Sequence, residues 1–206
     1  PIENGDNTLR LINSKSTGGE IKGALPVTAS SGNSKISLPV EIGDNVILND
    51  TDSGDTIKLN SSAYLLYSEK IAGYFSNGAF KVTDINGQQR IYGTCANAAK
   101  YAFDGVVTLL NNYTGTEIIY SGSTSMTLDL NGYTYTYTGS ENIVDVNYPN
   151  VTLTVKNGKL VATNENSVGV SMIGMGNNNK NNRGLVFENV EMTVPGETYG
   201  IVTNGT

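Results

Sequence analysis

Three stretches in the second half of the chain share one pattern: Leu128-Asp-Leu130-Asn-Gly-Tyr-Thr-Tyr135-Thr-Tyr137, Leu153-Thr-Val155-Lys-Asn-Gly-Lys-Leu160-Val-Ala162 and Leu185-Val-Phe187-Glu-Asn-Val-Glu-Met192-Thr-Val194. Each places apolar or aromatic side chains at offsets 0, 2, 7 and 9 from its first residue. A step of two residues is the period of a β-strand, in which alternate side chains point to one face. The step of five requires a turn, and Asn131-Gly132 and Asn157-Gly158 tolerate the positive φ of tight corners. The pattern predicts two strands and a corner, three times over.

A third apolar pair follows each stretch, at Val144 and Val146, then Val168 and Val170, then Tyr199 and Ile201. The stretches begin 25 and then 32 residues apart, and the seven added residues fall in the polar run 175–183, which we expect to be an exposed loop. Three strands and three corners per period describe one coil of a parallel β-helix, whose coils pair at about 4.8 Å and stack their inward side chains. A propeller blade would need about 40 residues and antiparallel hairpins.

This alignment makes five side chains core residues: Leu153, Val155, Leu160, Phe187 and Met192. We expect Leu153→Ala to lower the free energy of unfolding by about 2 to 5 kcal/mol, the usual range for a buried leucine. A denaturation midpoint equal to that of the parent would show that the alignment is wrong.

The run from Cys95 to Leu110 (CANAAKYAFDGVVTLL), followed by Met126 to Tyr133 (MTLDLNGY), resembles the opening of the pectate-lyase-like right-handed β-helices of large bacterial surface proteins. The resemblance covers about residues 90–206 and implies an adhesin-like protein, secreted or displayed on a cell wall. It also implies a short helix that caps the first coil, near residues 94–104. The residues favour that helix independently, because Thr94 can cap it and three alanines follow.

The chain is therefore expected to be all-β, with a right-handed parallel β-helix over residues 87–206. Residues 1–86 contain short apolar stretches between Gly, Asn, Ser and Asp turns, which predicts a smaller β-rich region. Two alternatives stay open for it, a small sandwich or the tail of a preceding solenoid. Near the other end, a strand at 199–201 is followed by Asn204-Gly205. We expect the chain to stop in mid-solenoid, with further coils or end-to-end self-association covering the last strand.

Composition excludes several classes of partner. The net charge is -6 with no histidine, and 13 lysines and arginines are scattered without a basic stripe, so nucleic acid and anionic membranes are not expected. No stretch approaches the 18 or more apolar residues of a membrane span. The one cysteine, Cys95, cannot form an internal disulfide and is expected to be a small buried side chain.

The sequence offers no assembled active site. No two carboxylates occupy the same strand position on adjacent coils, and Glu188 and Glu191 lie at a corner where solvated charge is ordinary. Without histidine, nucleophilic catalysis has only lysine or carboxylate as a base. We therefore expect no catalytic residues, and a polysaccharide lyase or glycosidase on this scaffold is the alternative.

One loop has the chemistry of a calcium site, and no other cofactor is expected. Asp50, Asp52 and Asp55 supply hard oxygen ligands around a glycine. The EF-hand spacing fails, because Gly54 stands at the fifth position from Asp50. An Asp-rich hairpin turn explains the same residues.

Ligand binding is expected from tyrosines near corners and from the polar loop. Tyrosine can stack its ring on a sugar or a protein while its hydroxyl stays in water. The predicted ligand-binding residues are Tyr113, Tyr120, Tyr133, Tyr148, Asn177, Lys180 and Arg183. The sequence thus favours an extracellular binding or adhesion module that presents a solenoid face to a glycan or a protein. A structural spacer or self-assembling surface subunit is a further alternative.

Overall fold

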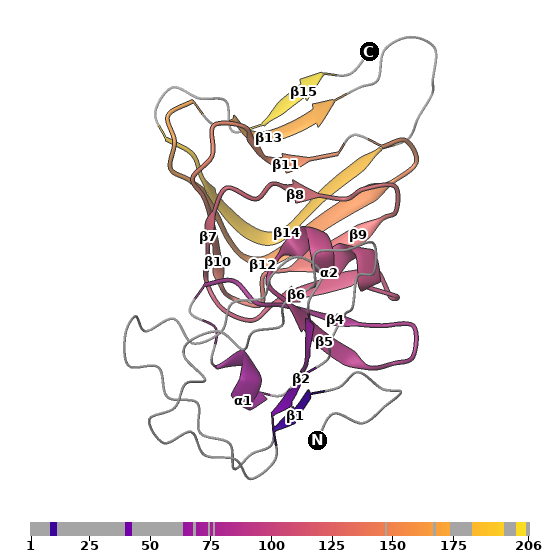
Figure 1. The fold of residues 1–206 in the computed structure, drawn as a ribbon. Helices are drawn as coiled ribbons and strands as arrows, with labels where there is room; N and C mark the ends of the chain where they lie inside the picture. The colour runs from indigo at the N-terminus through magenta and orange to yellow at the C-terminus, as the bar shows by residue number, and fades with distance from the viewer. Residues whose placement is uncertain are drawn as a thin grey trace, which may run out of the picture.

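The computed structural model shows an all-β chain, as the sequence predicts. The described residues are 9–11, 40–42, 64–67, 69–73, 75, 77–146, 148–166, 168–173, 183–195 and 201–204. Within them the strands form one long mixed sheet and one four-stranded sheet. In Figure 1 the chain climbs from β1 and β2 at the bottom to β15 at the top.

The lower part of the long sheet is mixed. Strands β1 (Leu9–Leu11), β2 (Val40–Ile42) and β3 (Tyr64–Leu66) are parallel neighbours, and helix α1 (Glu69–Ala72) follows them in the chain. Strands β4 (Phe80–Thr83) and β5 (Gln89–Tyr92) form an antiparallel hairpin. This hairpin pairs antiparallel with β3 on one side and with β6 (Val106–Leu109) on the other.

The turn between β4 and β5 is built around Asp84. Its Oδ1 accepts hydrogen bonds from the backbone N–H groups of Asn86 and Gln88, both at 2.8 Å, and its Oδ2 pairs with Nη2 of Arg90 at 2.5 Å. The Arg90 guanidinium lies over the Tyr64 ring, 4.1 Å from its centroid. The predicted boundary at residues 86 and 87 falls inside this turn, and strands pair across it. The division into regions 1–86 and 87–206 stays a prediction.

The predicted short helix is α2 (Cys95–Tyr101). The Thr94 side chain caps it by accepting a hydrogen bond from the backbone N–H of Asn97 at 3.2 Å, as the sequence predicts. Cys95 and Ala98 are buried, so the expectation for the cysteine is confirmed as well. Among the described residues, no helix is long and apolar enough to cross a membrane.

Every described pairing among the strands from β6 onward is parallel. In the first row, β6 pairs with β9 (Met126–Asp129), β9 with the first half of β12 (Thr152–Ala162), and β12 with β14 (Gly184–Thr193). The second row is formed as follows. Strand β7 (Tyr113–Gly115) pairs with β10 (Thr134–Tyr137), which pairs with the second half of β12. A third row contains β8 (Ile119–Tyr120), β11 (Asn142–Asp145), β13 (Val168–Ile173) and β15 (Val202–Asn204). In Figure 1 the strands of these rows lie one above another, and their colour runs from magenta to yellow along the chain.

The register confirms part of the sequence alignment and corrects the rest. Tyr135 pairs with Leu160 and Leu160 with Met192, as predicted. Leu153, however, pairs with Met126 rather than Leu128. The slip arises at the corner, where residues 131–133 form a turn after β9 while β12 runs through as one strand. A slip of two residues leaves each side chain on the same face, so alternation cannot detect it.

The third row is also displaced by two residues from the alignment. Val170 pairs with Val144, and Val168 pairs with Asn142 rather than with an apolar residue. The predicted equivalence of Val168 with Val144 was therefore wrong. Here too a slip of two residues keeps each side chain on the same face, so alternation could not detect it.

The predicted core is confirmed where strands lie on both sides. Leu153, Val155 and Leu160 of β12 are buried, between β9 or β10 and β14. Phe187 and Met192 of β14 pack against the same cluster but are partly exposed. Their strand pairs with β12 alone among the described strands.

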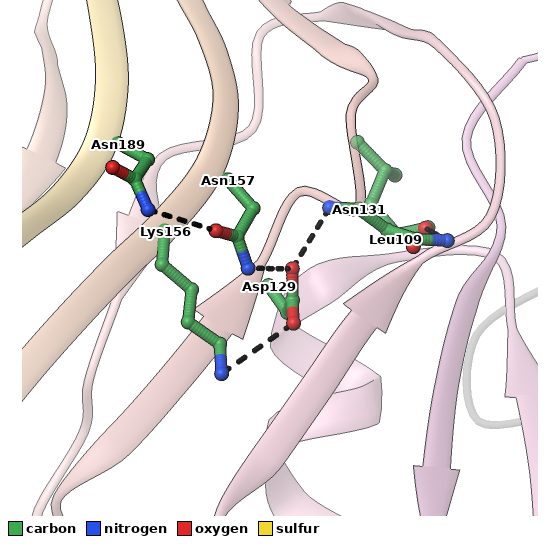
Figure 2. A network of polar contacts seen from close by, with 6 residues as sticks. All are labelled: Leu109, Asp129, Asn131, Lys156, Asn157 and Asn189. Carbon is green, nitrogen blue, oxygen red and sulfur yellow. Dashed lines mark hydrogen bonds and ion pairs between the residues drawn. The ribbon is translucent and has the colours of Figure 1, made fainter.

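Asparagines at positive φ mark the corner between the first two rows. Asn131, Asn157 and Asn189 have φ of 50°, 57° and 54°. Figure 2 shows their contacts: the Asn189 amide donates to Oδ1 of Asn157 at 3.5 Å, and the Asn157 amide donates to Oδ1 of Asp129 at 3.1 Å. The other Asp129 oxygen lies 3.5 Å from Nζ of Lys156. Hydrogen bonds and an ion pair between side chains thus connect three successive turns of the chain.

Candidate functional site

Two of the predicted tyrosines meet on the row that contains β8 and β11. Tyr120 ends β8 and is paired with Asp145 of β11. Tyr148 follows β11, where the chain turns toward β12 through Asn150 at a φ of 58°. The two rings contact edge to face, with centroids 6.0 Å apart and planes at 60°. Tyr148 is 42% exposed, so a ligand can reach this pair.

Arg183 joins the pair from the next turn of the chain. It immediately precedes β14, and its Nε donates a hydrogen bond to the Tyr148 carbonyl oxygen at 3.2 Å. The backbone N–H of Gly184 also donates to the Val151 carbonyl at 2.9 Å, which aligns the two turns. Tyr120, Tyr148 and Arg183 therefore form one surface cluster from residues far apart in sequence, here called the tyrosine cluster.

The tyrosine cluster has binding groups of several kinds. Burial raises the pKa of Tyr120, and its hydrogen bond with Tyr148 and the nearby charge of Asp145 raise it further. The Tyr120 hydroxyl therefore keeps its proton at neutral pH. An aromatic edge, a phenol, a guanidinium and a neighbouring carboxylate can stack on and hydrogen-bond to a polar ligand.

The other predicted tyrosines lie elsewhere. Tyr113 is only 9% exposed, and its ring packs against Tyr135 and Phe80 with centroids 4.4 and 5.9 Å away. Its ring is thus covered by other aromatic rings rather than by solvent. Tyr133 is half-buried at the corner between β9 and β10 and does not join the tyrosine cluster. Asn177 and Lys180 lie outside the described residues, as does most of the predicted loop 175–183.

The predicted calcium ligands Asp50, Asp52 and Asp55 also lie outside the described residues. In the part of the chain that is described, no group of three histidine, cysteine, aspartate or glutamate side chains could hold a metal ion. The calcium site therefore stays a prediction.

A repeated motif escaped the sequence alignment. Residues 113–117 read Tyr-Thr-Gly-Thr-Glu and residues 137–141 read Tyr-Thr-Gly-Ser-Glu. The first copy contains β7 and leads to β8, and the second begins at the last residue of β10 and leads to β11. Glu117 of the first copy accepts hydrogen bonds from the backbone N–H groups of Cys95 and Ala96 at 3.0 and 2.7 Å, so it holds the start of α2. The identity of four residues out of five was the signal that could have revealed it.

Comparison with known proteins adds no information about the tyrosine cluster. Family models, curated proteins and solved structures contain no match to the chain.

Proposed function

We propose that the protein is a non-enzymatic binding module of an extracellular surface, which presents the tyrosine cluster to a glycan. The observation that carries the proposal is the meeting of Tyr120, Tyr148 and Arg183 on one exposed surface. Exposed tyrosine rings beside charged hydrogen-bonding groups suit sugars, because sugars combine apolar ring faces with hydroxyl groups.

The scaffold we propose is a right-handed parallel β-helix capped by α2. Three rows of parallel strands and a buried stack of inward side chains support this interpretation. The short α2 packs against β4, β5 and β6, next to the first of the parallel strands. A solenoid holds side chains from successive turns in fixed register, which brings Tyr120, Tyr148 and Arg183 to one place.

A glycan array followed by calorimetric titration of the best ligand tests the proposal. Tyr148→Ala should weaken binding about fivefold or more, since loss of a stacked ring costs about 1 kcal/mol or more at a typical anchor. Tyr101→Ala is the matched control, because Tyr101 is similarly exposed, at 40%, but lies on α2. Equal weakening by both variants would contradict the assignment.

Two other outcomes would replace the proposal. Release of unsaturated product from polygalacturonate in the presence of calcium, followed by absorbance, would show a lyase. An array without any bound glycan would favour a protein partner or a structural spacer.

A further inference from the structure

The outer edge of strand β14 is a second surface feature, distinct from the tyrosine cluster. β14 (Gly184–Thr193) pairs along nearly its whole length with β12, and with no other strand among the described residues. Along such an edge, alternate backbone N–H and C=O groups point away from the neighbouring strand and are left without a partner in the sheet. A strand of another chain can hydrogen-bond to an edge of this kind.

The inward side chains of β14 are incompletely covered at this edge. Leu185, Phe187 and Met192 pack against the core cluster but are partly exposed. The residues paired with them in β12 are all 0% exposed. The exposure rises because β12 has neighbours on both sides, whereas β14 has one described neighbour. In a stack of parallel strands, one more strand covers such an apolar edge.

Charged side chains on the outer face alternate in sign from strand to strand. Asp129 of β9 lies opposite Lys156 of β12, which lies opposite Glu188 of β14. The Lys156 ammonium pairs with Asp129 at 3.5 Å, and Glu188 is exposed without an ion pair among the described residues. Lys159 of β12 lies opposite Glu191 of β14, with Nζ and Oε2 2.7 Å apart. The next strand in both rows therefore calls for a positive charge, since opposite charges on facing strands stabilise a sheet and like charges destabilise it.

The corner within β14 adds a requirement for an amide donor. Figure 2 shows that Asn189 donates to Oδ1 of Asn157, and that Asn157 donates to Oδ1 of Asp129. Asn157 thus uses its amide N–H on the preceding turn and its oxygen on the following one. Oδ1 of Asn189 is the open end of this line among the described residues. An asparagine at the same place on an added strand would continue it.

Pairing of two copies through β14 itself does not meet these requirements. Two copies joined edge to edge by a two-fold axis, with their inward faces on the same side, would pair β14 antiparallel to itself. In the register that brings the two corners together, Glu188 and Glu191 of one copy lie near the same residues of the other. Like charges so placed destabilise the sheet. The charge pattern therefore selects a different strand, one with basic side chains.

We infer that the edge of β14 binds a parallel strand of a second polypeptide, with apolar side chains at alternate positions and two basic residues three positions apart. The apolar side chains cover Leu185, Phe187 and Met192, and the basic residues face Glu188 and Glu191. An asparagine directly after the first basic residue completes the match at the corner. The direction is parallel because every described pairing from β6 onward is parallel. This inference is independent of glycan binding by the tyrosine cluster.

The probe is a synthetic peptide with the sequence of residues 152–162 (TLTVKNGKLVA), acetylated and amidated at its ends. It suits the edge because Lys156, Asn157 and Lys159 stand at the required positions. The peptide is titrated into the ¹⁵N-labelled chain at low ionic strength, and amide shifts and hydrogen exchange are followed. Shifts should centre on residues 184–193, and alternate amides of β14 should exchange about tenfold more slowly or better when a strand is added. The same peptide with both lysines replaced by glutamate should bind about tenfold more weakly or worse.

A charge reversal tests whether the two carboxylates select the partner. The variant with Glu188→Lys and Glu191→Lys should prefer the glutamate peptide to the lysine peptide, which a general loss of stability could not produce. The matched control carries Glu141→Lys and Glu165→Lys, the same change of charge at two exposed positions away from β14, and should keep the preference of the parent. The dispersion of each spectrum reports whether the variant is folded.

Four results would each overturn the inference. They are equal binding of the two peptides by the parent, an unchanged preference in the reversed variant, no shifts up to about 1 mM peptide, and protection of every β14 amide from exchange in the free chain. The last result would mean that another part of the chain or a second copy already covers this edge.

Discussion

Two copies of one short motif, Tyr113 to Glu117 and Tyr137 to Glu141, show how the same local structure serves different ends. In each copy the tyrosine hydroxyl accepts a hydrogen bond from the backbone N–H of the glutamate four residues later, at 3.1 Å. In each copy a Cβ on the glycine would overlap the end of the tyrosine side chain. The copies differ in the carboxylate, since Glu117 holds the start of α2 and Glu141 is exposed.

The difference teaches that backbone closure and side-chain use are separable in this fold. Tyrosine and glycine close the corner into the third row in both copies. Only the copy beside α2 uses its glutamate for a further contact. Substitutions at matched positions can therefore separate the closure of the corner, which both copies share, from the contact of the glutamate with α2, which only the first copy makes.

The largest effect is expected from removing the tyrosine side chains. Tyr137→Ala and Tyr113→Ala should each lower the free energy of unfolding by about 3 to 5 kcal/mol, since both rings are buried and an aromatic ring leaves a large cavity. Chemical denaturation measures both values. A loss below about 1 kcal/mol for one copy alone would show that the copies do not close their corners alike.

Adding a methyl group at the glycines should have the next largest effect. Gly139→Ala and Gly115→Ala should cost about 1 to 3 kcal/mol, the usual range for overpacking. We expect Gly139→Ala to cost more, because its Cβ would lie 2.5 Å from Cζ of Tyr137, compared with 2.8 Å from Cζ of Tyr113 for Gly115→Ala. Thermal or chemical unfolding checks the order, and the reverse order would contradict this explanation.

Replacing the two glutamates tests the contact with α2, which only the first copy makes. Glu117→Ala should cost about 0.5 to 2 kcal/mol, as loss of a helix cap does. Glu141→Ala, the matched control, should change stability by less than about 0.5 kcal/mol. Hydrogen exchange of the Cys95 and Ala96 amides should accelerate only in the Glu117 variant. Faster exchange of both amides in Glu141→Ala would end the distinction.

The smallest effect concerns pH. Burial raises the pKa of Glu117 despite the two backbone hydrogen bonds that lower it. The folded chain therefore holds this proton more tightly than the unfolded chain does, so the free energy of unfolding should fall as pH rises from the unfolded pKa through the folded one. Comparison of the parent with Glu117→Gln between about pH 4 and 7 isolates the contribution of Glu117 to the pH dependence of the free energy of unfolding. The parent should lose stability relative to the variant over that range, and a relative gain would reverse the assigned direction.

Local sequence patterns predicted the strands, their inward faces and the helix cap at Thr94, because each depends on neighbouring residues. It could not predict the pairing of Leu153 with Met126, since a two-residue slip preserves every face. It named Tyr120, Tyr148 and Arg183 singly but not their meeting, which depends on how successive turns stack. The contact of Glu117 with α2 spans more than twenty residues, and no local pattern encodes it.

The spacing between paired residues carries a consequence for how such a chain can change in evolution. Leu160 follows its partner Tyr135 by 25 residues, Val170 follows Val144 by 26, Leu153 follows Met126 by 27, and Leu185 follows Leu153 by 32. The rows stay paired despite these unequal lengths, so insertions and deletions are absorbed between strands. A corner such as that at Asn164 to Asn166, between β12 and β13, is therefore a place where a foreign peptide could be grafted without disturbing the neighbouring rows.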